Sequence, residues 1–74
     1  MEFFIKRLLE IRTSKNISQI AISKSINISL RSYQRYEKGE REPSLTVIYS
    51  IADYFDVSTD YLLGRTDNPN SHKL

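Results

Sequence analysis

The 74-residue chain contains no cysteine and one histidine. Without cysteine it can form no disulfide, no cysteine-ligated zinc site and no thiol nucleophile, which suits a reducing compartment. The histidine, His72, stands near the C-terminus, and no carboxylate pair or hydroxyl has a base at a plausible catalytic spacing. The sequence therefore predicts neither an enzyme nor a cofactor site, and it implies no small-molecule ligand.

Long apolar runs are also missing, and none approaches the roughly 20 residues that a membrane-spanning helix needs. The opening stretch 1–7 is short and soon interrupted by charge, so we expect no signal peptide, no membrane partner and a cytoplasmic location. At this length we expect one small domain.

Net charge is only +2, but the charges are unevenly distributed. Residues 1–41 hold nine Lys and Arg against four Glu, a net charge of +5. Residues 42–74 hold two Lys and Arg against five Asp and Glu, a net charge of −3. This division favours one face for nucleic acid and another for a different role.

Apolar residues recur at helical spacing throughout, and no strand-like alternation occurs. The first such stripe, in residues 2–12, is widened by three further apolar side chains, which are either extra core or a self-association surface: Phe3, Ile5 and Leu9. Residues 13–16 read as a turn. We predict an all-α, compact bundle of about five short helices.

Serine residues precede four of these helices and are good N-caps: Ser18, Ser29, Ser44 and Ser58. Asn27 tolerates positive φ and closes the tight turn between the second and third helices, in the manner of a helix-turn-helix. Gly39 and Gly64 are suited to end helices, and Pro43 prevents the third helix from continuing.

The helix expected between Ser29 and Gly39 has two different sides. Tyr33 and Tyr36 lie together on one of them. Three cationic residues line the other: Arg31, Arg35 and Lys38. Such a helix can pack on a core while it offers positive charge outward, although a basic edge can also be only a solvated surface.

In order along the chain, these segments resemble the Xre/Cro/phage-repressor (lambda-repressor-like) family of helix-turn-helix DNA-binding domains. The most specific part of the resemblance is the run from Tyr36-Glu37-Lys38-Gly39 to Arg41-Glu42-Pro43-Ser44, and it closes with Asp60-Tyr61-Leu62-Leu63-Gly64. The resemblance spans about residues 4–65. We therefore predict a DNA-binding domain over 1–65 and a flexible C-terminal tail over 66–74.

The resemblance implies that the third helix enters the major groove by its N-terminal end. Four residues match positions that face base edges: Ser29, Leu30, Arg31 and Arg35. Arginine reads guanine through O6 and N7, whereas Leu30 suits a thymine methyl group. Phosphate contacts are expected from Ser18, Gln19, Gln34, Lys38, Arg41 and Ser44.

Arg12 and Glu37 match a pair that in the family bridges the first helix to the end of the third; the alternative is two exposed charges. Three residues depart from the family pattern. Asn27 stands where glycine is usual, Ile20 stands where a polar residue is common, and Tyr33 is larger than the usual aliphatic residue, so its hydroxyl must find a partner.

The resulting hypothesis is a sequence-specific, double-stranded DNA-binding transcriptional regulator of Cro/repressor type, acting as a homodimer on an inverted repeat. The alternative is a protein-interaction module of antitoxin or antirepressor type with little DNA affinity. Residues of the C-terminal part are either a dimer surface or core: Tyr54, Tyr61 and Leu62.

Overall fold

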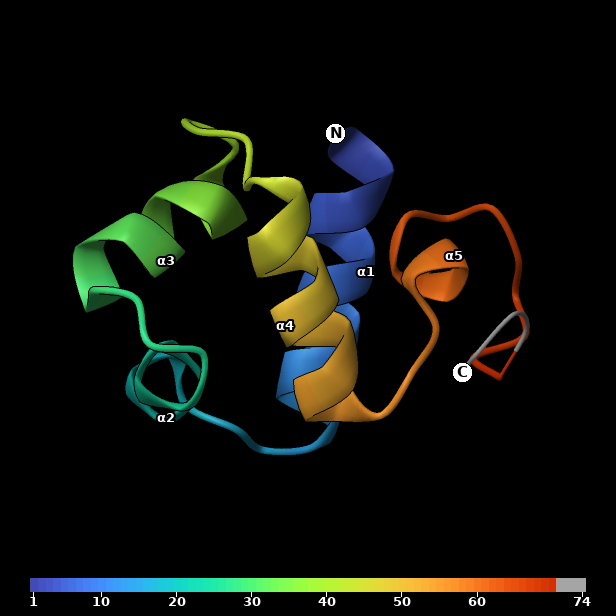
Figure 1. Cartoon of the computed structure of the whole chain (residues 1–74), viewed down its shortest axis with the longest axis horizontal. Helices are drawn as coiled ribbons and strands as arrows, with labels where there is room; N and C mark the ends of the chain where they lie inside the picture. The colour runs from blue at the N-terminus through green and yellow to red at the C-terminus, as the bar shows by residue number, and fades with distance from the viewer. Residues whose placement is uncertain (71–74) are drawn as a thin grey trace.

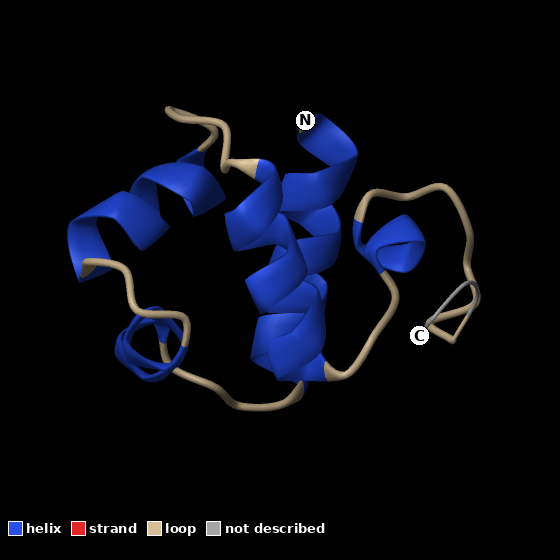
Figure 2. Ribbon diagram, in the orientation of Figure 1, coloured by secondary structure: helices blue, strands red, loops and turns tan. Residues whose placement is uncertain are grey.

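The structure is a computed structural model that describes residues 1–70. It contains five helices and, within that range, no strand (Figure 2). They are α1 (Glu2–Ser14), α2 (Gln19–Ser25), α3 (Leu30–Lys38), α4 (Leu45–Phe55) and α5 (Thr59–Leu62). The predicted all-α bundle of five short helices is confirmed.

All four predicted serine N-caps are confirmed. Each serine Oγ accepts a hydrogen bond from the backbone N–H three residues later. In every helix after α1, one backbone N–H of the first turn therefore has a partner that the helix itself cannot supply. The other ends are equally regular, because each helix is followed by a residue in the left-handed conformation. These residues are Asn16, Asn27, Gly39, Asp56 and Gly64.

The end of α1 differs from the prediction of a turn over residues 13–16. The helix continues through Ser14 because the hydroxyls of Thr13 and Ser14 donate to carbonyls of their own helix, at Leu9 and Ile11. The chain turns only afterwards, at Asn16, whose φ is 56°. Hydroxyl side chains alone therefore did not mark the end of the helix.

The helices α1 and α4 form the middle of the molecule, with α2 and α3 on one side and α5 on the other (Figure 1). One continuous core joins them, and its fully buried members come from all five: Leu8, Ile22, Tyr33, Ile51 and Leu62. The Cα atoms span 30 × 22 × 20 Å. The helix-turn-helix unit of α2 and α3 is thus held at one end of the long axis.

The predicted tail, residues 66–74, is described as far as Asn70. In that part the Ser58 N–H donates to the Pro69 carbonyl over 2.7 Å, and Asp67 pairs with Arg7. The flexibility of the tail stays a prediction. Residues 71–74, with His72 among them, lie outside the described residues.

Within the described residues, no helix combines the length and the apolar character that crossing a bilayer demands.

Candidate nucleic-acid interface

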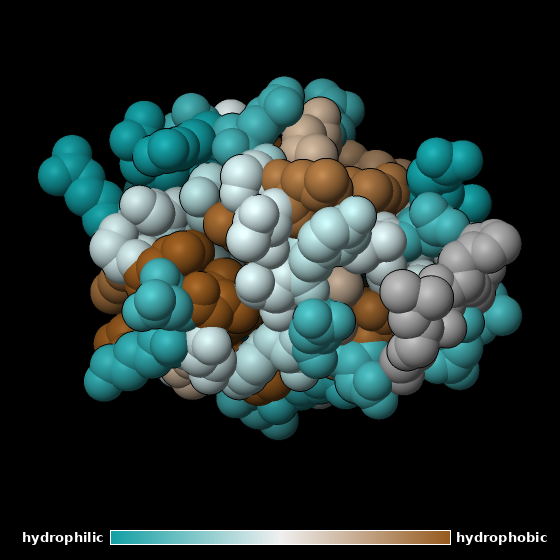
Figure 3. Space-filling model, viewed as in Figure 1, coloured by the Kyte–Doolittle hydropathy of each residue, from teal (hydrophilic) through white to brown (hydrophobic). Residues whose placement is uncertain are grey.

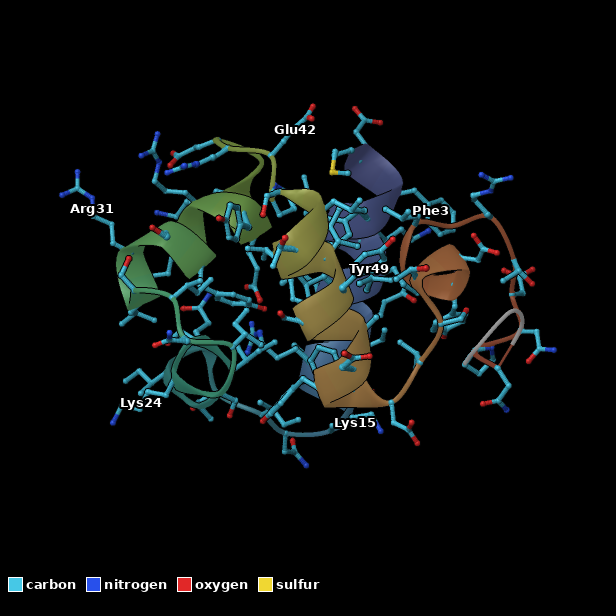
Figure 4. All side chains as sticks on the ribbon, viewed as in Figure 1. Phe3, Lys15, Lys24, Arg31, Glu42 and Tyr49 are labelled. Carbon is cyan, nitrogen blue, oxygen red and sulfur yellow. The ribbon has the colours of Figure 1, made fainter. Side chains whose placement is uncertain are left out.

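Helix α3 presents two chemically different sides, as the sequence predicted. Tyr33 and Tyr36 are buried in the core, at 0% and 6% exposure. Arg31, Arg35 and Lys38 are exposed, and none of their side chains makes a hydrogen bond or ion pair with any described residue. Figure 4 shows Arg31 reaching outward from the start of the helix. The helix therefore offers free cations to solvent from a fixed support.

The four residues expected to read bases lie at the N-terminal and outer parts of α3. Arg31, Arg35 and Ser29 are exposed, and Leu30 is half-buried. Ser29 Oγ accepts from the Ser32 N–H and donates to Ser32 Oγ, each over 3.0 Å. Its hydroxyl is thus already used as a helix cap.

The residues expected to contact phosphate fall into three groups. Ser18 and Ser44 are exposed N-caps of α2 and α4, so each lies at a helix N-terminus that favours anions. Lys38 and Arg41 are exposed cations at the end of α3 and in the following loop, and neither forms a salt bridge with a described residue. The third group, Gln19 and Gln34, is engaged with the protein itself.

The side-chain amides of Gln19 and Gln34 are hydrogen-bonded to each other. Gln34 Nε2 donates to Gln19 Oε1 over 3.2 Å, and Gln19 Nε2 donates to Glu37 Oε1 over 2.9 Å. A primary amide carries two N–H donors, so each glutamine keeps one for another acceptor. The start of α2 is in this way tied to the middle and the end of α3.

Glu37 is the centre of this network, and the structure joins it to Arg12. Arg12 Nε donates to Glu37 Oε2 over 2.6 Å and Nη2 donates to Oε1 over 3.1 Å, while Nη1 donates to the Ile17 carbonyl over 2.9 Å. Tyr33 donates its hydroxyl proton to Glu37 Oε2, which gives that buried hydroxyl the partner it needs. A bidentate guanidinium–carboxylate pair fixes both position and angle. Helix α3 is thereby locked onto α1 and α2.

The electrostatics of the network follow from these bonds. Burial alone would raise the pKa of Glu37, but the hydrogen bonds from Arg12, Tyr33 and Gln19 outweigh it and hold that pKa below its usual value. The bond to Glu37 raises the pKa of Arg12, and burial, followed by the bond to Glu37, raises that of Tyr33. The carboxylate therefore stays ionised at neutral pH, and the tyrosine stays protonated.

Sequence reasoning missed the role of Arg7. Its side chain is buried, and its guanidinium carbon lies 4.0 Å from the ring centre of Tyr61 and 4.9 Å from that of Phe3. Its Nη2 also lies 3.4 Å from Asp67 Oδ1. The one sequence signal was the spacing of Phe3 and Arg7, which places an aromatic ring and a cation one helical turn apart. This stack fastens α5 and the chain after it to α1.

Two further expectations concern apolar residues. Of the two alternatives for Leu62, a dimer surface or core, the structure confirms core, because this side chain is 0% exposed. Tyr61 is half-buried against Arg7, and Tyr54 is half-buried with its ring edge-on to Phe55. Ile20, an apolar residue at a position where the family commonly has a polar one, is 53% exposed, as that position leads us to expect.

Within residues 1–70, no group of three or more acidic or histidine side chains is placed to hold a metal ion.

Comparisons with known proteins agree with this geometry. A model of the helix-turn-helix family matches residues 8–62, which contain α2, α3, α4 and α5 whole. The chain is 41% identical over 61 residues to the HTH-type transcriptional regulator AnsR of Bacillus subtilis, covering 82% of this chain and 53% of AnsR. It is 36% identical over 69 residues to the cryptic phage CTXphi transcriptional repressor RstR of Vibrio cholerae, covering 93% of this chain and 62% of RstR.

A third relative is an uncharacterized HTH-type transcriptional regulator of Bacillus subtilis, YobD, 33% identical over 67 residues that make up 90% of this chain and 60% of YobD. This chain therefore spans little more than half the length of these relatives. No solved structure gave a significant match. The names of the relatives describe regulators of transcription, in agreement with the expectation that the chain is not an enzyme. The chain belongs to the helix-turn-helix family of Xre/Cro/phage-repressor type.

Proposed function

We propose that this chain is a cytoplasmic, sequence-specific DNA-binding transcriptional regulator of the Cro/repressor type, which inserts α3 into the major groove of a double-stranded operator. The observation that carries the proposal is the division of α3: its tyrosines are fixed in the core, and its cationic side chains are exposed and form no ion pair with residues 1–70. A polyanion is the natural partner of such a surface. Membership of the family and the names of the relatives support the same function.

Within this function the side chains divide by role. Arg31 and Arg35 would read guanine edges by paired hydrogen bonds, and half-buried Leu30 would contact a thymine methyl group. Ser29 would contribute to base reading as the N-cap of α3, because it determines where the helix begins. Lys38, Arg41 and the N-termini of α2 and α4 would meet phosphates and fix the register of the helix on the duplex.

The same reasoning favours a homodimer on an inverted repeat. One α3 of nine residues presents few side chains to base edges, too few for a useful ratio of specific to non-specific affinity. Two copies related by a two-fold axis would read half-sites about one helical turn apart.

Selection of bound sites from random duplex DNA tests the proposal directly. A recurring sequence is expected, with an affinity that falls steeply as salt rises. A chain that enriches no sequence, and binds all duplexes weakly or not at all, would instead be a protein-interaction module.

Two variants then distinguish a residue that reads base edges from a residue that contacts the phosphate backbone. Arg31→Ala should cost ~1–3 kcal/mol on the selected site and relax preference at one base position. Gln19→Ala should weaken binding to all duplexes similarly, because its expected partner is a phosphate. If Arg31→Ala instead lost the same affinity on every sequence, Arg31 would be a residue that contacts phosphate and not a base.

A further inference from the structure

Helix α4 exposes apolar side chains that the helix-turn-helix unit does not use. Leu45 is 61% exposed and Tyr49 is 50% exposed, and they lie one turn apart on the same side of the helix. The adjoining side of α4 is buried in the core through Ile48, Ile51, Ala52 and Phe55. Leu45 and Tyr49 therefore form an outward apolar strip, called the α4 face below.

The α4 face is also nearly free of charge, although 27% of the chain is charged. The only charged residue among the 11 of α4 is Asp53, one turn beyond Tyr49. Figure 3 shows this region in white and brown, with strongly hydrophilic residues around its edge.

A two-fold interface brings the same patch of two subunits together, so a patch that carries charge of only one sign would face charge of the same sign. The basic edge of α3 could not pair with itself for this reason. A neutral apolar strip can do so without repulsion and gains by leaving water. Pairing through α4 would also leave the cations of α3 uncovered, because Arg31, Arg35 and Lys38 belong to a different helix.

We propose that the α4 face is the surface through which a second copy of this chain binds. The inference rests on the proposed function, because it supplies the interface of the dimer proposed there. A stable dimer buries about 1,200–2,000 Å² in total. Two exposed side chains per copy supply only part of that area, so the free dimer is weak, and the duplex completes it by holding two copies at high local concentration.

The test compares variants that remove apolar surface without changing charge. The double variant Leu45→Gln, Tyr49→Gln should raise the dimer dissociation constant at least about tenfold, because each residue occurs twice in a two-fold interface. Its matched control is Ile20→Gln, which removes an apolar side chain of similar exposure (53%) from α2 and should change that constant less than about twofold. Sedimentation equilibrium measures the constant, and urea unfolding checks that each variant is folded.

DNA binding gives the second measurement. On a duplex with one half-site the single variant Tyr49→Gln, one turn away from the N-terminus of α4, should bind as the unchanged chain does. On the full inverted repeat the double variant should lose cooperative binding. The dimer constant should also stay within about twofold between 0.1 and 0.5 M salt, because the α4 face carries almost no charge to screen.

The outcomes separate the two proposals. A double variant that still dimerises normally, or a dimer dispersed by salt, overturns the α4 face as the interface. A chain that binds the inverted repeat as independent single copies overturns both the interface and the dimer, and leaves DNA recognition intact. Loss of dimerisation in the double variant, in a chain that selects no DNA sequence, supports the interface and overturns the proposed function.

Discussion

At the residue scale, the feature on which the site depends is one buried carboxylate. Glu37 is 8% exposed and accepts hydrogen bonds from side chains on α1, α2 and its own helix: Arg12, Gln19 and Tyr33. A carboxylate taken out of water needs such donors, since an unpaired buried charge is strongly unfavourable. The same bonds determine where α3 sits, so stability and recognition depend on the same atoms.

Removal of one partner should therefore be costly. Arg12→Met leaves Glu37 buried without its bidentate partner and should lower the free energy of unfolding by about 3–5 kcal/mol. Urea unfolding monitored by circular dichroism measures this. The matched control is Arg41→Met, an exposed arginine with no salt bridge to a described residue, which should change stability by less than about 0.5 kcal/mol. Equal effects of the two substitutions would contradict the role of the network.

The pKa of Glu37 makes a separate prediction about acid. Because that pKa is lower in the folded chain than in the unfolded chain, the contribution of Glu37 is complete above the unfolded value, about 4.3, and is lost as pH falls through the folded value. Unfolding midpoints measured from pH 7 to pH 2.5 should thus hold steady and then fall. In Glu37→Gln the unfolding midpoint should fall less steeply at low pH. If the fall is unchanged in that variant, it arises from other carboxylates.

At the element scale, each helix is delimited by local chemistry. Gly39 ends α3 with φ 75°, and a Cβ built there would lie 3.1 Å from Ile5 Cδ1. Gly39→Ala should therefore lower the free energy of unfolding by about 1–2 kcal/mol through backbone strain. Asn27 has φ 60° in the helix-turn-helix turn, and Asn27→Gly should be neutral or slightly stabilising. Thermal unfolding of both variants checks this contrast, and losses of equal size would mean that conformation at these turns is not what matters.

The sequence predicted the features that depend on residues close together in the chain better than those that depend on residues far apart. The serine caps, the left-handed turn at Asn27 and the outward cations of α3 depend on neighbours within about one turn, so they were legible in the residues alone. The Arg12–Glu37 pair joins residues 25 apart and was suggested only by the family resemblance.

Contacts that depend on tertiary approach were not predicted. The bond from Gln19 to Glu37 and the stacking of Arg7 on Tyr61 require helices to meet at particular angles, and no local pattern encodes those angles. For Leu62 the sequence could not decide between core and a dimer surface for a related reason: a helix of four residues is too short to show an apolar stripe. In this chain, element boundaries are local information, and the hydrogen-bond network behind α3 is not.

At the scale of the whole molecule, the cations lie at different places on the surface. Arg31 extends from the α3 end of the molecule, whereas Lys15 lies at the foot of α1, away from that end (Figure 4). Only cations that meet phosphates release counterions, so position and not net charge decides the salt dependence of DNA binding. A chain of net charge +2 can in this way bind a polyanion strongly.

This difference in position predicts different effects for two lysines of equal charge. Lys38→Ala should reduce the slope of log K against log salt by about 0.9 for each copy bound, because one phosphate contact is lost. Lys15→Ala removes the same charge from the foot of α1 and should leave the slope unchanged, with at most a small fall in affinity from the weaker long-range field. Fluorescence anisotropy on the selected duplex between 50 and 300 mM salt measures both slopes. Equal slopes in the two variants would mean that the duplex responds to total charge, and the assignment of phosphate contacts to the α3 end would have to be abandoned.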